Sequence, residues 1–148
     1  MIKFIHIKDF QSHQDTKIDF DPGLNLIVGE SDSGKTSVVR ALNLLVNNRP
    51  MTANWFSNFA GNKGVTEISV EFDDCKIILE KYVEKGKNGK KVRTSKYKVN
   101  EKQLEAFGWD LPEEVENSVR LYDINWQSQH EMGFLILETA GDIGKKIN

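Results

Sequence analysis

The chain has 148 residues, of which 39% are hydrophobic and 28% charged, with a formal net charge of −2. This length predicts one domain with a buried core. No apolar run approaches the roughly 20 residues that cross a membrane, so we expect no membrane partner. The single cysteine, Cys75, excludes an internal disulfide and favours a cytoplasmic location.

The N-terminal third predicts strands followed by a helix. "IKFIHIKDF" and "TKIDFD" alternate apolar and polar residues, as half-buried strands do. Pro22-Gly23 predicts a turn, and the apolar run Leu24–Val28 predicts a strand buried on both faces. A helix is then predicted up to Pro50 from apolar residues at helical spacing, namely Val38, Val39, Leu42, Leu45 and Val46.

The remainder predicts a hairpin and further short elements. "WFSNFAG" is typical of a short helix or ordered loop, and "VTEISVEFDD" and "CKIILEKYVEK" predict two strands joined at Asp73-Asp74. "GKNGKK" predicts a turn and "VRTSKYKV" a returning strand. "EKQLEAFG" favours a helical piece, and "DLPEEVENSV" a helix with Asp110 as cap and Pro112 in its first turn. "RLYDINW" predicts another strand, with helix from Phe134 onward.

One motif carries clear chemistry. Residues 29–36 spell G-x-x-x-x-G-K-T between the predicted buried strand and the helix, the context of a phosphate-binding loop. The two glycines allow close backbone approach, and the loop N–H groups and helix dipole attract an anion. Lys35 would neutralise the β- and γ-phosphates of ATP, and the Thr36 hydroxyl would bind Mg²⁺. The predicted nucleotide-binding residues are Gly29, Glu30, Ser31, Asp32, Ser33, Gly34, Lys35, Thr36 and Ser37.

The other groups needed for phosphoryl transfer are not evident. A phosphate loop needs an acidic residue at the metal and a group that positions water. Asp73-Asp74 end an alternating strand and Asp123 lies within one, so neither follows the usual apolar run. A self-sufficient small kinase or GTPase remains an alternative, although no N-K-x-D segment or lid-like arginine cluster is present. A non-catalytic nucleotide-dependent DNA-binding module is a third interpretation.

"FQSHQDTKIDFDPGLNLIVGESDSGKTSVVRALNLL" resembles the N-terminal head segment of SMC/SbcC/RecF/RecN-type ATPases, and most closely the SbcC-like subgroup with its bacteriophage relatives. The residues that match this pattern are Phe10, Ser12, His13, Phe20, Pro22, Gly23 and Asn25. The resemblance implies an α/β P-loop NTPase head lobe of the ABC type. Its mixed sheet would contain an antiparallel strand group and flanking helices.

The resemblance also implies what lies outside this lobe. Residues 1–148 would be a single N-terminal lobe, and a coiled coil and a C-terminal lobe would follow. The C-terminal lobe would supply a signature motif and the second acidic motif. Two complete heads would sandwich two ATP molecules in a homodimer acting in DNA repair or recombination, with a nuclease as a possible further partner. The isolated chain would then turn ATP over poorly.

Two implied site features depend on this resemblance. Gln129, in "LYDINWQSQHEMGFLIL", would contact Mg²⁺ and the attacking water, with Gln127 as the alternative and a solvated pair of glutamines as the simpler interpretation. Ser12 would lie at the nucleotide. Ser31-Asp32 departs from the asparagine and glycine common in the family, but aspartate tolerates a positive φ. Gln11 replaces an arginine that is common in the family, so we expect no cationic nucleotide contact at this position.

Residues 81–98 concentrate positive charge, with eight Lys/Arg and one Glu. A phosphate-facing surface would bind DNA through Lys85, Lys87, Lys90, Lys91, Arg93, Lys96 and Lys98. Tyr82 and Tyr97 would add stacking contacts. The alternative is a solvated hairpin whose charge protects an edge strand from pairing.

Overall fold

The structure, a computed structural model, describes residues 1–49, 53–60, 63–86, 89–106 and 110–119, with the single positions 121, 127, 139, 141, 143 and 144. Within these, the side chains of residues 53, 58, 63, 85, 86 and 89–93 are not described. The chain divides into two units, Met1–Ser118 and Val119–Asn148. In the second, the Ile143 N–H donates to the Thr139 carbonyl at 3.0 Å. In the described part of the chain, no helix is long and apolar enough to cross a membrane.

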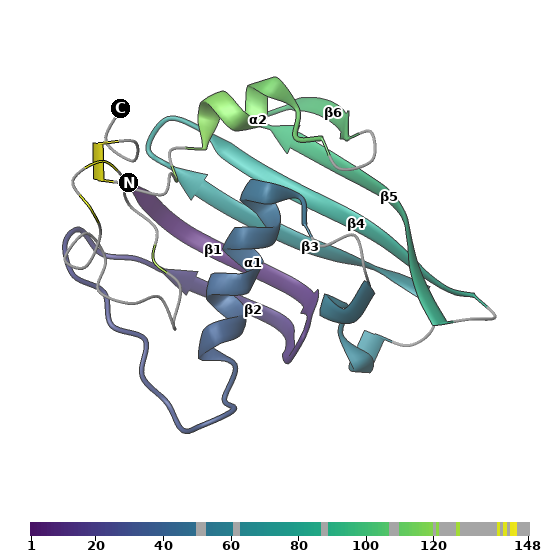
Figure 1. Cartoon of the computed structure of the whole chain (residues 1–148). Helices are drawn as coiled ribbons and strands as arrows, with labels where there is room; N and C mark the ends of the chain where they lie inside the picture. Colours follow the sequence, from purple (N-terminus) through teal and green to yellow (C-terminus); the bar gives the residue numbers. More distant parts are fainter. Residues whose placement is uncertain are drawn as a thin grey trace. The chain divides into compact units, whose positions relative to one another are not determined.

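The first unit contains a six-stranded sheet with the order β2-β1-β3-β4-β5-β6 (Figure 1). Every strand pairing among the described residues is antiparallel. The strands are β1 (Ile2–Phe10), β2 (His13–Asp19), β3 (Lys63–Phe72), β4 (Lys76–Gly86), β5 (Gly89–Val99) and β6 (Lys102–Ala106). The predicted alternating strands, and the hairpin through Asp73-Asp74, are therefore confirmed.

The core lies between one face of the sheet and helix α1 (Lys35–Asn47), which crosses β1 and β3 (Figure 1). The sheet contributes fully buried residues from alternating positions, among them Ile5, Ile7, Ile68, Val70, Ile77 and Leu79. The helix contributes Val38, Ala41, Leu44 and Leu45. The predicted helix is confirmed, but Val39 is 41% exposed because the buried face runs through Ala41 and Leu44 instead.

Short elements fix the end of β1. The 3-10 helices η1 (Ala53–Trp55) and η2 (Asn58–Ala60) confirm the predicted short helical segment. The Gln11 N–H donates to the Trp55 carbonyl at 2.7 Å, and Phe56 forms a bridge with Phe10. Trp55 also stacks on Phe10, with ring centroids 6.4 Å apart. The turn between β1 and β2 is therefore held by the segment that follows α1.

The predicted buried strand Leu24–Val28 is wrong for the described structure, where this run is irregular and exposed. Leu24 is 98% exposed, Leu26 82% and Val28 76%. A strand forms only where a neighbouring strand pairs with its N–H and C=O groups, and no described strand lies beside this run. The local sequence pattern could not show that this partner is missing.

The predicted helix in "EKQLEAFG" is also wrong, because Lys102–Ala106 forms β6. β6 pairs with β5 from Val99 with Lys102 to Ser95 with Ala106. Asn100 adopts φ 54° in the tight turn between them. The left-handed turn and the backbone ladder outweigh the helical propensity of the segment.

The predicted helix after Asp110 is confirmed as α2 (Glu113–Ser118), whose Val115 N–H donates to the Pro112 carbonyl at 2.9 Å. The strand predicted in "RLYDINW" and the helix predicted from Phe134 fall almost entirely outside the described residues.

Candidate nucleotide-binding site

Residues 29–34 form a loop whose glycines are required by close packing. Gly34 has φ 96°, and a Cβ at this position would lie 2.6 Å from Ser12 Oγ. A Cβ on Gly29 would lie 2.8 Å from Ser33 Oγ. Asp32 adopts φ 60°, so its predicted tolerance of a left-handed backbone is confirmed. This loop, called the cradle below, therefore packs closely against the Ser12 and Ser33 hydroxyls, and a Cβ at either glycine would require one of these side chains to move.

The Lys35 side chain folds back over this cradle. Its ammonium donates to the Gly29 carbonyl at 2.8 Å and to the Glu30 carbonyl at 2.5 Å. The ammonium also lies 3.4 Å from Ser33 Oγ. Lys35 thus brings one positive charge to the loop. A bound anion would replace the two backbone carbonyls as the partner of this ammonium.

The N-terminal end of α1 adds to this positive character. Gly34 occupies the N-cap without a side-chain hydrogen bond, and the first turn contains no acidic residue. The Ser37 N–H is used within the helix, donating to the Gly34 carbonyl at 2.9 Å. An uncapped helix start points N–H groups and the positive end of its dipole outward. The arrangement suits a phosphate group.

The predicted loop residues differ in exposure. Glu30, Ser31, Asp32 and Ser33 are exposed, Lys35 and Thr36 are half-buried, and Ser37 is buried. Thr36 lies in the first turn beside Lys35, as the magnesium prediction requires, and already makes a polar contact within the protein. Ser37 is 8% exposed.

The turn between β1 and β2 packs directly on the loop. Ser12 approaches Gly34, which places this predicted residue beside the cradle. His13 Nε2 lies 3.2 Å from the Gly34 carbonyl, and His13 Nδ1 lies 3.0 Å from Thr16 Oγ1. Sequence reasoning recognised His13 only as part of a motif and missed this contact with the loop. The Ser12-His13 pair in that motif was the signal that could have found it.

The predicted glutamine sensor lies outside the described structure. Gln129 falls among residues that the structure does not describe, and Gln127 is described only as an exposed position. Neither is brought to the loop by any described contact.

The predicted basic hairpin is confirmed in its backbone, since β4 and β5 pair as far as Gly86 with Gly89. Lys87 and the side chains of Lys85, Lys90, Lys91 and Arg93 lie outside the described residues. Tyr97 is fully buried and donates to the Leu45 carbonyl at 2.9 Å, so the predicted stacking of Tyr97 on DNA is wrong. Alternation along β5 turns Tyr97 into the core.

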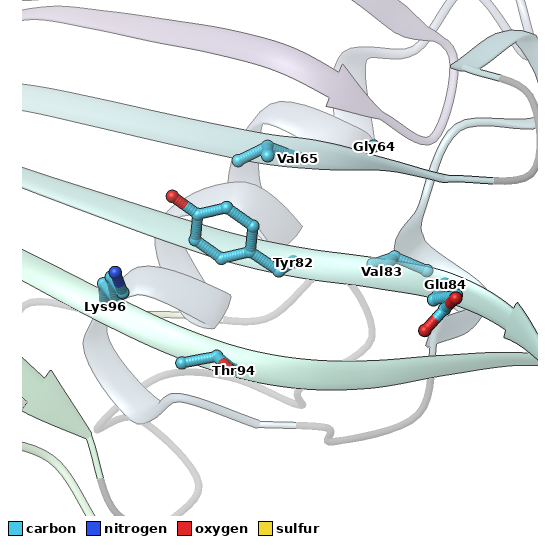
Figure 2. Close-up of a pocket in the computed structure, with 7 residues that line it drawn as sticks. All are labelled: Gly64, Val65, Tyr82, Val83, Glu84, Thr94 and Lys96. Atoms are coloured by element: carbon cyan, nitrogen blue, oxygen red, sulfur yellow. The ribbon is translucent and has the colours of Figure 1, made fainter.

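The described part of the hairpin carries a shallow groove of about 510 Å³, which Figure 2 shows from β3 across β4 to β5. Lys96 lies 5.5 Å from the centroid of the Tyr82 ring. The Tyr82 hydroxyl donates to Glu80 at 3.1 Å, and Lys98 pairs with the same carboxylate. The hydrogen bond from Lys98 lowers the pKa of Glu80. The charge of Lys98 is thus balanced by the Glu80 carboxylate, while the Lys96 ammonium lies over the Tyr82 ring.

The chain is similar in sequence to a known family of ATPase domains. The AAA ATPase domain family, in the form designated AAA_15, matches residues 1–131. The chain belongs to this AAA ATPase domain family. The matched range includes the phosphate loop, the whole described sheet and both predicted sensor glutamines, Gln127 and Gln129.

Curated relatives match part of this chain. The DNA double-strand break repair Rad50 ATPase of Archaeoglobus fulgidus is 48% identical over 42 residues, which are 28% of this chain and 5% of the relative. The RecF DNA replication and repair protein of Desulfitobacterium hafniense is 40% identical over 45 residues, 30% of this chain and 12% of RecF. The Rad50 ATPase of Pyrococcus abyssi is 33% identical over 86 residues, 53% of this chain and 10% of the relative. The matched segments are therefore small parts of these proteins.

Solved structures agree on the fold of the ATPase domain. A structure from work on ATP-driven dimerization and DNA-stimulated activation of SMC ATPases has a TM-score of 0.54 and 19% identity, covering 78% of this chain and 75% of that one. The recombination mediator RecF–ATPrS structure has a TM-score of 0.51 and 24% identity, covering 72% and 28%. The predicted resemblance to SMC/RecF/Rad50-like ATPase head lobes and the predicted fold class are confirmed.

Proposed function

We propose that this chain is the ATP-binding N-terminal lobe of an SMC/SbcC-like ATPase that acts in DNA repair or recombination. The observation that carries the proposal is the packed loop at Gly34, which brings the Lys35 ammonium and the uncapped start of α1 together. In this proposal Lys35 binds the β- and γ-phosphates, and Thr36 and Gln129 hold Mg²⁺. Bound magnesium would neutralise charge on the phosphates.

The exposed run Leu24–Val28 supports a partner lobe beside the phosphate loop. Its backbone has no described strand partner, and three of its apolar side chains are more than three-quarters exposed. Exposed apolar residues in a row are typical of an interface. We propose that strands of the protein's own C-terminal lobe pair with this run and complete the sheet.

The larger assembly is also a proposal. One structural neighbour comes from work on ATP-driven dimerization and DNA-stimulated activation of SMC ATPases. By analogy, ATP would join two heads of this protein as a homodimer in the cytoplasm, each completing the other's site, and a nuclease would be a further partner. Hydrolysis then belongs to the complete head dimer, because the second acidic and signature motifs are absent from these 148 residues.

Nucleotide binding is tested on the 148-residue chain by titration calorimetry with MgATP, comparing wild type with Lys35→Ala. We expect measurable binding by the wild type and a loss of at least about 100-fold in the variant, since a charge-assisted contact is removed. Lys102→Ala, which removes an exposed lysine paired with Glu114, is the matched control. Wild-type affinity in Lys35→Ala would contradict the proposal, and rapid ATP turnover by the chain alone would favour a self-sufficient enzyme.

The partner-lobe proposal is tested with Leu26→Ser. Because Leu26 is already exposed, we expect a change of less than about 0.5 kcal/mol in the free energy of unfolding, together with weaker binding of an apolar dye. Leu44→Ser, at a buried position of α1, is the control that should unfold the chain. A large loss of stability in Leu26→Ser would mean that the run is buried within this chain.

DNA binding by the hairpin is tested by measuring affinity against salt concentration. Lys90→Ala/Lys91→Ala should lower the slope of log affinity against log salt by about 2 relative to the wild type, if both lysines contact phosphates. Lys102→Ala is again the control. An unchanged slope in the double variant would favour the solvated-hairpin interpretation.

A further inference from the structure

A lysine is buried where β4 and β5 meet the C-terminal end of α1. Lys81 is 0% exposed, and its neighbours on the same face of β4, Leu79 and Val83, are buried as well. The ammonium donates to Asn48 Oδ1 at 2.5 Å and to Ser95 Oγ at 3.1 Å. It also lies 5.8 Å from the Trp55 ring centroid. Burying an ammonium is costly, so these contacts offset a real desolvation penalty.

The group that Lys81 holds is the C-cap of α1. Asn48 is fully buried, has a left-handed backbone with φ 53°, and donates its N–H to the Leu44 carbonyl at 2.9 Å. The Asn48 carbonyl lies 3.5 Å from the Lys81 ammonium. The Tyr97 hydroxyl donates to the carbonyl of Leu45. The Lys81 ammonium and the Tyr97 hydroxyl thus donate to carbonyls at the negative end of the helix, which have no partner within the helix itself.

The opposite end of the same helix is the phosphate loop. There His13, the first residue of β2, contacts the Gly34 carbonyl. The turn that precedes His13 is held by the hydrogen bond from the Gln11 N–H to the Trp55 carbonyl. Trp55 therefore links the turn beside the loop to the buried lysine. A 13-residue helix is about 20 Å long and stiff over that length, so a shift at one end reorients the other.

We propose that Lys81 is a positioning residue for nucleotide binding, which sets the direction of the phosphate loop by fixing the far end of α1 and Trp55. The inference rests on the proposed function of the loop. It predicts that Lys81 matters more for nucleotide affinity than for folding, because methionine keeps most of the apolar volume and removes the cost of burying an ammonium, which offsets the lost hydrogen bonds to Asn48 and Ser95.

The test compares Lys81→Met with two controls in the 148-residue chain. Ile77→Ala alters the same buried face of β4 and should lower the melting temperature without changing MgATP affinity by more than about twofold at a temperature where the chain is folded. Lys76→Met removes a lysine from the same strand and should be silent. Lys81→Met should stay folded and bind MgATP at least about tenfold more weakly.

Hydrogen exchange of the amides in residues 33–38 gives a second readout that needs no nucleotide. We expect exchange there to be at least about fivefold faster in Lys81→Met and unchanged in Lys76→Met. Folded Lys81→Met with wild-type MgATP affinity overturns the inference. If the wild type itself fails to bind MgATP, the proposed function fails, and unchanged exchange in Lys81→Met then overturns the inference separately.

Should Lys81→Met fail to fold, Asn48→Gly removes the Oδ1 acceptor while keeping a residue that favours the left-handed backbone. This variant should also weaken MgATP binding, by about threefold or more. Wild-type affinity and wild-type exchange in folded Asn48→Gly would overturn the inference.

Discussion

The two ends of α1 are built in opposite ways. At its N-terminal end, Gly34 leaves the helix uncapped, and the loop from Glu30 to Ser33 is exposed. At its C-terminal end, Leu45 and Asn48 are fully buried, and carbonyls accept hydrogen bonds from Lys81 and Tyr97. The C-terminal end is therefore fixed within the core, whereas the N-terminal end has an uncapped start beside an exposed loop.

The two ends of α1 should differ most in how much a truncated side chain lowers the free energy of unfolding. Leu45→Ala, at a fully buried position near the C-terminal end, should lower the free energy of unfolding by about 2–5 kcal/mol. Val39→Ala, at a 41% exposed position nearer the N-terminal end, should change it by less than about 0.5 kcal/mol, because alanine favours helix. Urea unfolding followed by circular dichroism measures both. Similar losses would mean that the two ends do not differ in this way.

The next effect concerns the charge at the packed end. Burial lowers the pKa of Lys81 from 10.5 to about 8 in the folded chain. Between these values the unfolded chain holds a proton that the folded chain has released, so raising the pH favours folding. We expect stability to rise by about 2 kcal/mol between about pH 7 and pH 9.5. The measurement is urea unfolding across this range.

Lys81→Met is the control for this pH dependence, because it removes the titrating group and should flatten the rise. Burial raises the pKa of the Tyr97 phenol well above its usual range, which would lower stability only at still higher pH. A rise that persists in Lys81→Met would show that another group is responsible.

Alanine substitutions at two glycines should have a smaller effect on stability and separate crowding from backbone strain at the N-terminal end of α1. Gly34 and Gly23 have nearly the same φ, 96° and 99°, but only Gly34 is crowded by other side chains. Alanine should cost about 1–2 kcal/mol at either site through the left-handed backbone. Gly34→Ala should in addition weaken MgATP binding by at least about tenfold, because the β1–β2 turn must move. Equal MgATP affinities in the two variants would contradict the crowded-cradle description.

The smallest expected effect belongs to His13. His13→Ala removes the contact with the Gly34 carbonyl and should cost about 1 kcal/mol in the free energy of unfolding, with weaker MgATP binding. His6→Ala is the matched control, since His6 bonds the exposed Asp15 away from the loop. Thermal unfolding and calorimetry measure both variants. If MgATP bound more weakly to His6→Ala but not to His13→Ala, the proposed support of the loop by His13 would be wrong.

Elements with a local cause could be predicted well. The hairpin through Asp73-Asp74 follows from period-two alternation, and the phosphate loop from the spacing of Gly29, Gly34 and Lys35. The segment Lys102–Ala106 could not, because its helical propensity is overridden by pairing with β5. The helix around Val39 could also be predicted, but its 41% exposure could not, because only packing against β1 and β3 selects which residues of α1 are buried.

A phosphate-binding loop could be predicted from local sequence, since the glycines, the Lys35 ammonium and the start of the helix all lie within residues 29–36. The residues that surround this loop could be found only from the folded chain. His13 meets Gly34 across 21 positions, Lys81 meets Asn48 across 33, and Tyr97 meets Leu45 across 52. Such contacts depend on which strands pair, and local periodicity carries no information about distant partners. For the same reason, periodicity could not show that no described strand pairs with Leu24–Val28.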